Sequence, residues 1–136
     1  MEYFKFEEKE KLAAVISKLK TWKTKVLFSN HDFQKTPSKE EIVSRLTGME
    51  LAGGDIAKIT VMPQTQADVL TLCNATKEAD DTMQIPVITM SMGELGKVTR
   101  IAGNITGSVL TFAAAGTASA PGQLPISFVK QWFSGE

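Results

Sequence analysis

A single lysine within an apolar stretch is the residue of this chain that could most directly do chemistry. Lys58 lies in the run DIAKITVMP, which follows Gly53 and Gly54 and ends at Pro63. Such a run is typical of a buried parallel strand. Burial disfavours the ammonium form of a lysine and lowers its pKa, and the neutral amine can attack a carbonyl to form a Schiff base. Two interpretations stay open from this run alone: a reactive amine, or a lysine at a strand end that reaches water or pairs with a carboxylate.

The only histidine of the chain is a second candidate. His31 closes the apolar run KVLFSNH and is followed directly by Asp32. An imidazole that titrates near neutral pH can act as a general acid or base, but a histidine at this place can also be a hydrogen-bonded or capping residue. The alternation of side chains along a strand places His31 on the same face as Leu27 and Ser29.

Four strand-like runs alternate with helical patterns along the chain. The strands are expected at residues 25–31, 55–63, 85–92 and 108–115, which is typical of βαβ units with a parallel sheet. In such sheets, functional side chains gather beyond the carboxyl ends of the strands. Lys58 should lie on a mixed inner face, because the alternation gives the other side of its strand to residues that pack on helices. Those helix-facing residues are Ala57, Ile59 and Val61.

Helices are expected at residues 7–22, 36–53 and 65–81 and near the carboxyl end. The second has two possible amino-terminal caps, Thr36 and Ser38. One side of the first helix should carry Leu12, Val15, Ile16 and Leu19. The apolar residues of the last helix, expected to pack back on the domain, are Ile126, Val129, Trp132 and Phe133.

Two loops are richer in functional groups than simple turns require. The segment 92–108 surrounds Arg100 with glycines, and an arginine near a mixed-polarity site suits bidentate binding of a carboxylate or phosphate. The small-residue segment 116–125 carries Ser119 and Gln123 as hydrogen-bonding groups. This second loop is either a mobile lid over a polar ligand or an ordinary surface turn.

Composition excludes several classes of protein. The chain has 136 residues, enough for one domain, and its 15 basic and 15 acidic side chains argue against a nucleic-acid surface. One histidine and one cysteine, far apart, fit no usual metal site, and the glycines form no nucleotide-binding motif, so we expect neither metal nor cofactor. The lone Cys73 excludes a disulfide within the chain. No apolar run is long enough for a membrane span, so we expect a soluble, cytoplasmic protein.

Five segments together resemble one family. SNHDF, DIAKITVMP, ITMSMGELGKVTR, GSVLTFA and ASAPGQ, in this order and spacing, closely resemble type I 3-dehydroquinate dehydratase, the Schiff-base enzyme of the shikimate pathway to aromatic amino acids. The resemblance covers nearly all of this chain but only the carboxyl-terminal part of the family, a (βα)8 TIM barrel nearly twice as long. It implies that residues 1–136 form a single domain, about half a barrel with four βα units and a carboxyl-terminal helix. EYFKF then resembles the end of the family's fourth strand, and VTR stands where a serine-arginine pair is more usual.

The resemblance also implies roles for individual residues. Lys58 would form an imine with the C3 ketone of the substrate, and His31 would act as general acid and base, removing a C2 proton while the C1 hydroxyl leaves. Arg100 would bind the substrate carboxylate, and Ser119 and Gln123 would contact its polar groups from the lid. The implied apolar walls of the pocket are Met90, Met92 and Phe112.

The resemblance also shows what this sequence lacks. The family's first half supplies a glutamate that orients the histidine, together with further arginine and acidic residues. Half a barrel leaves two unpaired edges and exposes inner residues such as Ile88, Met90 and Phe112. We expect a homodimer to complete the barrel; a separate chain with the missing half and a rearranged sheet are the alternatives.

Two functions therefore stay open. The first is a dehydratase-type lyase that converts 3-dehydroquinate to 3-dehydroshikimate once its site is complete. The alternative is a truncated, catalytically impaired relative, which keeps Lys58, Arg100 and Gln123 and serves as a binding or assembly module.

Overall fold

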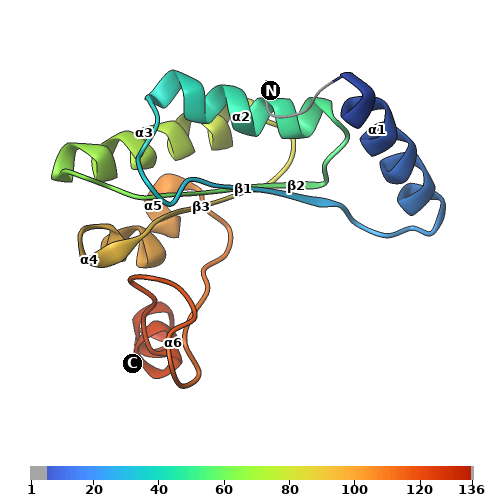
Figure 1. The fold of residues 1–136 in the computed structure, drawn as a ribbon. Helices are drawn as coiled ribbons and strands as arrows, with labels where there is room; N and C mark the ends of the chain where they lie inside the picture. Colours follow the sequence, from blue (N-terminus) through green and yellow to red (C-terminus); the bar gives the residue numbers. More distant parts are fainter. Residues whose placement is uncertain (1–5, 136) are drawn as a thin grey trace.

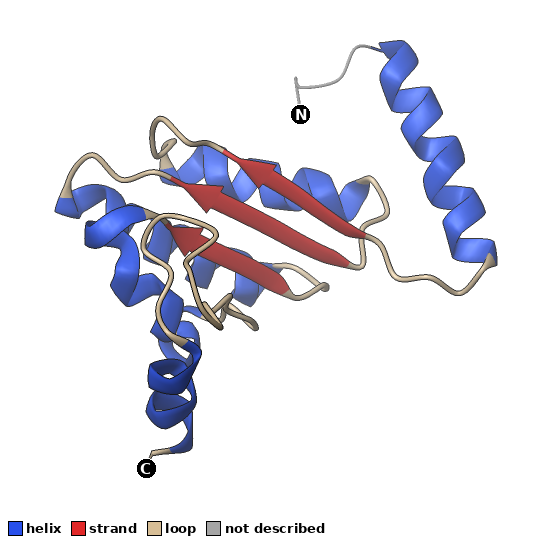
Figure 2. Cartoon of the chain, turned by 60° about the horizontal axis from the view of Figure 1, so that its bottom comes forward, coloured by secondary structure: helices blue, strands red, loops and turns tan. Residues whose placement is uncertain are grey.

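The computed structural model of this chain describes residues 6–135, which fold into a parallel sheet with helices. The elements in chain order are α1 (Phe6–Thr21), β1 (Leu27–His31), α2 (Lys39–Leu51), β2 (Ile56–Val61), α3 (Gln66–Thr82), β3 (Val87–Ser91), α4 (Gly93–Gly96), the 3-10 helix η1 (Lys97–Ile101), α5 (Gly103–Thr106) and α6 (Ile126–Ser134). The strand order is β1-β2-β3, and both pairs are parallel; Figure 1 labels the strands of this sheet, which it shows nearly edge-on, and Figure 2 shows their three arrows pointing the same way. The expected βαβ alternation is confirmed for this part of the chain.

The two long helices α2 and α3 cover one face of the sheet, as Figure 2 shows. The helix-facing residues of β2 are the three expected ones, Ala57, Ile59 and Val61, each 0% exposed. They pack in one apolar cluster with residues of α2 and α3 such as Leu46 and Leu72. Because side chains alternate along a strand, this packing turns the neighbouring residues of β2, Lys58 among them, to the opposite face.

The sequence sets the start of both covering helices. Ser38 caps α2, because its hydroxyl accepts a hydrogen bond from the backbone N–H of Glu41 at 3.2 Å. Thr65 caps α3 in a reciprocal arrangement with Asp68, in which each side chain accepts from the other residue's backbone N–H. These caps fix where each loop from the carboxyl end of a strand ends and its helix begins.

The fourth expected strand, at residues 108–115, is not formed in the described structure. The segment runs beside β3, where the backbone N–H of Val109 donates to the carbonyl of Val87 at 3.0 Å. The next available donor of β3, the N–H of Thr89, bonds to the hydroxyl of Ser108 at 3.0 Å. A side-chain oxygen thus takes the place of a backbone carbonyl, and the strand ladder does not continue.

The same segment covers part of the inner face. We expected Ile88 and Met90 to be exposed in half a barrel, but they are only 2% and 3% exposed. That expectation was wrong for both residues, because the chain after β3 folds back over this end of the sheet. Phe112, at 41% exposed, and Leu27 of β1, at 45%, do remain open to solvent.

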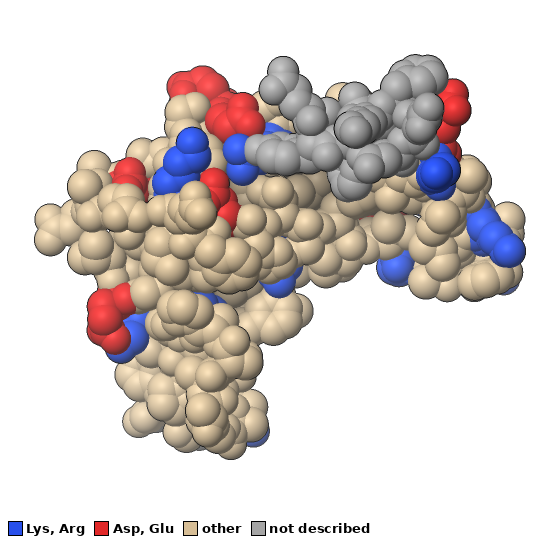
Figure 3. Space-filling model, in the orientation of Figure 1, with Lys and Arg blue, Asp and Glu red and all other residues tan. Residues whose placement is uncertain are grey.

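The two terminal helices bury less of their apolar surface than expected. In α6 only Val129 is buried, whereas Trp132 and Phe133 are more than half exposed. The helix is held by η1, where the indole N–H of Trp132 donates to the carbonyl of Ile101 at 3.0 Å. It forms an arm below the sheet that shows few charges on the face seen in Figure 3. In α1 the expected apolar side is also only partly covered, since Ile16 alone is buried among the described side chains.

Among the described residues, no helix combines the length and the apolar character needed to cross a membrane.

Candidate active site

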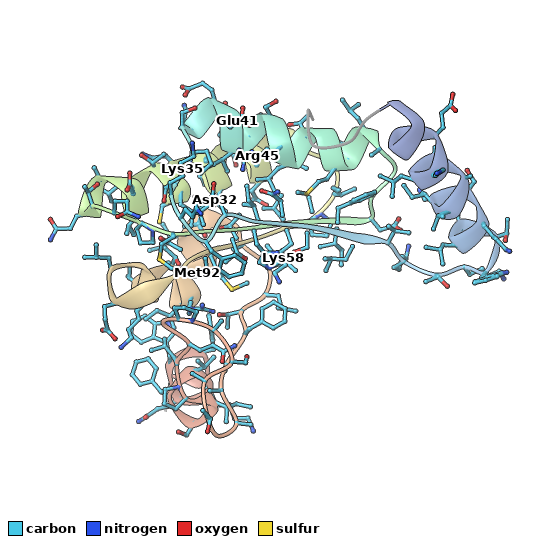
Figure 4. All side chains as sticks on the ribbon, viewed as in Figure 1. Asp32, Lys35, Glu41, Arg45, Lys58 and Met92 are labelled. Carbon is cyan, nitrogen blue, oxygen red and sulfur yellow. The ribbon has the colours of Figure 1, made fainter. Side chains whose placement is uncertain are left out.

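Lys58 lies in the middle of the sheet, on the face away from α2 (Figure 4). Its partners in register are Ser29 of β1 and Ile88 of β3. The ammonium nitrogen lies 4.6 Å from the centre of the Phe112 ring, a cation–π contact with the segment after α5. None of the described carboxylates forms an ion pair with Lys58. The carboxylate-paired interpretation therefore finds no support in the described residues.

The pKa of Lys58 is lowered from its ordinary value. The larger cause is burial, and the second is repulsion by the positive charge of Arg100. Both causes favour the neutral amine, which is the nucleophilic form.

His31 ends β1 and lies opposite Thr60 of β2 in the register. Its ring stacks on Phe33, with 5.7 Å between the ring centres and 8° between the planes. Its Nδ1 lies 3.5 Å from the hydroxyl of Ser29, at the limit of a hydrogen bond. Burial, and secondarily the charge of Lys58, lower the pKa of His31, so the imidazole is neutral at physiological pH and can accept a proton.

Arg100 is a buried cation at the floor of the same region, with 3% of its surface exposed. Its Nη1 donates to the sulfur of Met90 at 3.2 Å and its Nη2 to the carbonyl of Pro121 at 3.0 Å. The Nε atom has no hydrogen-bond partner, and none of the described carboxylates pairs with the guanidinium. A buried guanidinium whose partners are all neutral keeps an uncompensated positive charge, which is suited to an anionic ligand.

Ser119 and Gln123 lie in the loop that follows the segment beside β3. The amide oxygen of Gln123 accepts from the backbone N–H of Ser119 at 2.8 Å, and its amide nitrogen donates to the Ser119 hydroxyl at 3.0 Å. The two side chains thus hold each other in a compact loop, with polar groups next to the cavity. The structure brings both to the site, and this position is compatible with a lid as well as with a surface turn.

All eight residues singled out from the sequence line one cavity of about 290 Å³. They are Lys58, His31, Arg100, Ser119, Gln123, Met90, Met92 and Phe112. These residues come together because the sheet is parallel: β1, β2 and β3 all have their carboxyl ends on the same side of the sheet, and the loops that follow them start there.

Sequence reasoning missed four further residues that line the cavity. They are Phe33, Thr60, Ala120 and Pro121. The alternation along the strand already places Thr60 on the same face as Lys58, two residues away, so this residue could have been named for the site. The other three lie in loops, and the sequence has no periodic pattern there from which the course of the backbone could be predicted.

A larger cavity of about 520 Å³ also has Arg100 in its wall and is lined by residues of α5, by segment 107–111 and by Phe133. Arg100 is its only titratable lining residue among those described. We therefore take the smaller cavity, which joins a lysine, a histidine and an arginine, as the candidate active site. In the part of the chain that the structure describes, no group of three or more His, Cys, Asp and Glu side chains could hold a metal ion.

A lysine, a histidine and an arginine that line one cavity on the open face of a parallel sheet, with helices on the other face, are typical of an α/β protein of the barrel type with a polar site. The model of the type I 3-dehydroquinase family matches residues 1–134, and the chain belongs to this family.

Individual relatives agree with this assignment. The 3-dehydroquinate dehydratase of Shouchella clausii is 52% identical over 119 residues, which are 88% of this chain and 45% of that protein. The 3-dehydroquinate dehydratase of Lactiplantibacillus plantarum is 49% identical over 122 residues, 90% of this chain and 48% of that protein. Among solved structures, the type I 3-dehydroquinate dehydratase of Clostridium difficile has a TM-score of 0.88 at 46% identity, covering 93% of this chain and 50% of that one. The chain spans about half the length of the relatives it matches.

Proposed function

We propose that this chain carries the Schiff-base part of a dehydratase site that converts 3-dehydroquinate to 3-dehydroshikimate. The observation that carries the proposal is the pairing of Lys58 and Arg100 in one cavity without a described protein carboxylate to neutralise either. A substrate with a ketone for the amine and a carboxylate for the guanidinium fits these two groups. The relatives named 3-dehydroquinate dehydratase support this identity of the substrate.

Lys58 begins the reaction. Its neutral amine adds to the C3 ketone, and loss of one water gives an imine whose protonated nitrogen withdraws electrons from C2. Burial and Arg100 both lower the pKa of Lys58, so part of the amine is in the attacking form at a lower pH than for an exposed lysine.

His31 moves the protons. As a neutral imidazole it takes the proton from C2, the electron pair enters the C1–C2 bond, and the C1 hydroxyl leaves with a proton as water. Hydrolysis of the imine consumes one water, releases the product and restores the amine of Lys58. The net change is the loss of one water from the substrate.

The remaining residues bind and enclose the substrate. Arg100 takes the carboxylate, Ser119 and Gln123 contact hydroxyl groups from the loop above, and apolar walls exclude water. Those walls are Met90, Met92 and Phe112.

A homodimer, or a partner chain that supplies the other half, completes the site in this proposal. β1 has one side paired with β2, and no described strand pairs with its other edge. Leu27 and Phe33, at 45% and 62% exposed, mark the same open side. An unpaired edge beside exposed apolar side chains favours association. A cytoplasmic location belongs to the same proposal, since the lone Cys73 suits a reducing compartment.

Borohydride trapping tests the function. The 136-residue chain is treated with 3-dehydroquinate and borohydride, and the labelled peptide is identified by mass spectrometry. We expect one adduct on Lys58, none in Lys58→Ala, and full labelling in Lys130→Ala, a control lysine on α6. Absence of an adduct in the unaltered chain, or an adduct at another lysine, would overturn the proposal. A binding module without turnover would trap substrate but release no 3-dehydroshikimate.

A further inference from the structure

The loop that carries Ser119 and Gln123 touches the turn after β3 through two glycines. Gly93 and Gly122 both have left-handed backbone angles, with φ of +71° and +77°. A Cβ atom built on Gly122 would lie 2.4 Å from the carbonyl oxygen of Gly93 and 2.9 Å from its nitrogen. Since no real side chain approaches a backbone so closely, only glycine fits at position 122 with the loop in this position.

The residue before this contact links the loop to the buried cation. The carbonyl of Pro121 accepts from the backbone N–H of Gly93 at 3.2 Å and from Nη2 of Arg100 at 3.0 Å. One carbonyl oxygen therefore joins the loop, the turn after β3 and the guanidinium. We call this set of contacts among Gly93, Arg100, Pro121 and Gly122 the latch.

Two of the three guanidinium nitrogens of Arg100 donate hydrogen bonds, Nη1 to Met90 and Nη2 to Pro121. Nε and Nη2 lie on the same edge of a guanidinium, the edge that binds a carboxylate with two parallel hydrogen bonds. Here Nη2 is bonded to Pro121, whereas Nε has no partner and is closed to solvent. The carbonyl of Pro121 is neutral, so it orients the guanidinium without cancelling the charge that attracts an anion.

We propose that Gly122 is a positioning residue: by closing the latch, it lets Pro121 hold the guanidinium of Arg100 in the orientation in which this side chain lines the cavity and can bind a ligand carboxylate. The identity of that carboxylate rests on the proposed function, but the latch itself does not. Without the latch, Arg100 keeps its charge and its bond to the sulfur of Met90 but loses the second bond, to Pro121, that fixes the rotation of the guanidinium.

Two alanine substitutions in the same loop separate the latch from general effects on the loop. Gly122→Ala should open it, because a Cβ at this position meets the Gly93 backbone. Gly116→Ala is the matched control, because a Cβ at position 116 would have no heavy atom within 4 Å and the φ of Gly116 is not left-handed.

Hydrogen exchange of the Gly93 amide measures the latch without any substrate. Loss of its hydrogen bond to Pro121 should speed exchange by about 10-fold in Gly122→Ala, the factor that corresponds to one net hydrogen bond. Exchange in Gly116→Ala should equal that of the unaltered chain. Equal exchange in all three proteins would overturn the proposal. If Gly122→Ala does not fold, Arg100→Ala is the second test, since removal of the Nη2 donor should also speed exchange at Gly93.

Kinetics with 3-dehydroquinate test the positioning role. Gly122→Ala should raise KM by about 10-fold with kcat within about 2-fold, because a carboxylate contact made equally in ground and transition states affects binding alone. In an Arg100→Ala background the same change should have no further effect on KM. An equal loss in that background would show a merely structural role and overturn the proposal. If the unaltered chain neither traps nor turns over substrate, the proposed function fails, and the exchange comparison still decides on the latch.

Discussion

The guanidinium of Arg100 lines the same cavity as the ammonium of Lys58 and contributes to the lowered pKa of that lysine. Two cations in one cavity repel each other, and each is also partly desolvated. Burial lowers the pKa of Arg100 too, but a guanidinium stays protonated in proteins, so Lys58 is the group that loses its proton as the pH rises. In the proposed function, this difference suits Lys58 to act as the nucleophile and Arg100 to bind an anion.

Arg100→Ala should therefore change the pH dependence of trapping as well as its extent. Removal of the repelling charge raises the pKa of Lys58, so less neutral amine is present at a given pH. The rate of borohydride trapping should rise with pH along a curve displaced to higher pH, although burial, the larger cause, still keeps the pKa below its ordinary value. An unshifted curve would show that the two charges do not interact.

The effect of the Lys58 charge on the pKa of His31 can also be measured, because the chain has a single histidine. The charge of Lys58 contributes to the lowered pKa of His31, so Lys58→Ala should raise that pKa while burial still holds it below 6.5. A proton NMR titration follows the imidazole signal without assignment, because His31 is the only histidine. Lys130→Ala, on α6, serves as the control and should leave the titration unchanged.

Turnover and binding should depend on different residues. His31→Ala should slow turnover by roughly 100- to 10,000-fold while ligand binding changes little, because a placed proton-transfer group acts in the transition state. Arg100→Ala should mainly raise the dissociation constant of the substrate. Isothermal titration and steady-state rates on the two variants test this division, and small, equal effects in both would favour the binding module.

The elements that could be predicted from the sequence are those fixed by local pattern. The two faces of β2 followed from the alternation around Lys58, and Ser38 was one of two predicted caps for α2. The strand expected at 108–115 does not form, because the hydroxyl of Ser108 accepts the hydrogen bond from the N–H of Thr89 in β3 that a backbone carbonyl would accept in a strand ladder. No local pattern reveals such competition, since it arises only when two distant segments meet.

In the candidate site, too, some features could be predicted from the sequence and others could not. Lys58 and His31 were found from their places in predicted strands, and Arg100, Ser119 and Gln123 from the composition of their loops. The contact between Pro121 and Arg100 could not be predicted, because it depends on the close approach of two glycine backbones. Burial on α6 was overestimated, since its apolar residues face no second layer in the described structure.

Two leucines of α3 provide a direct test of the core. Leu72 is fully buried in the cluster between α3 and the sheet, whereas Leu70 on the same helix is 65% exposed. Leu72→Ala should lower the free energy of unfolding by about 2–5 kcal/mol through lost burial and a residual cavity. Leu70→Ala should change it by less than about 0.5 kcal/mol, as urea denaturation of both variants would show.

The open side of the sheet leads to the prediction on assembly. Leu27 is 45% exposed at the start of β1, beside an edge to which no described strand is paired. The chain should therefore sediment as a dimer or larger species at low micromolar concentration, and its melting temperature should rise with protein concentration. Leu27→Lys should weaken association, because a charge on this side would be desolvated by a partner. Leu51→Lys is the control, since Leu51 is 83% exposed on α2, the helix that covers the other face. A folded monomer with a melting temperature independent of concentration would contradict completion of the barrel by a second copy.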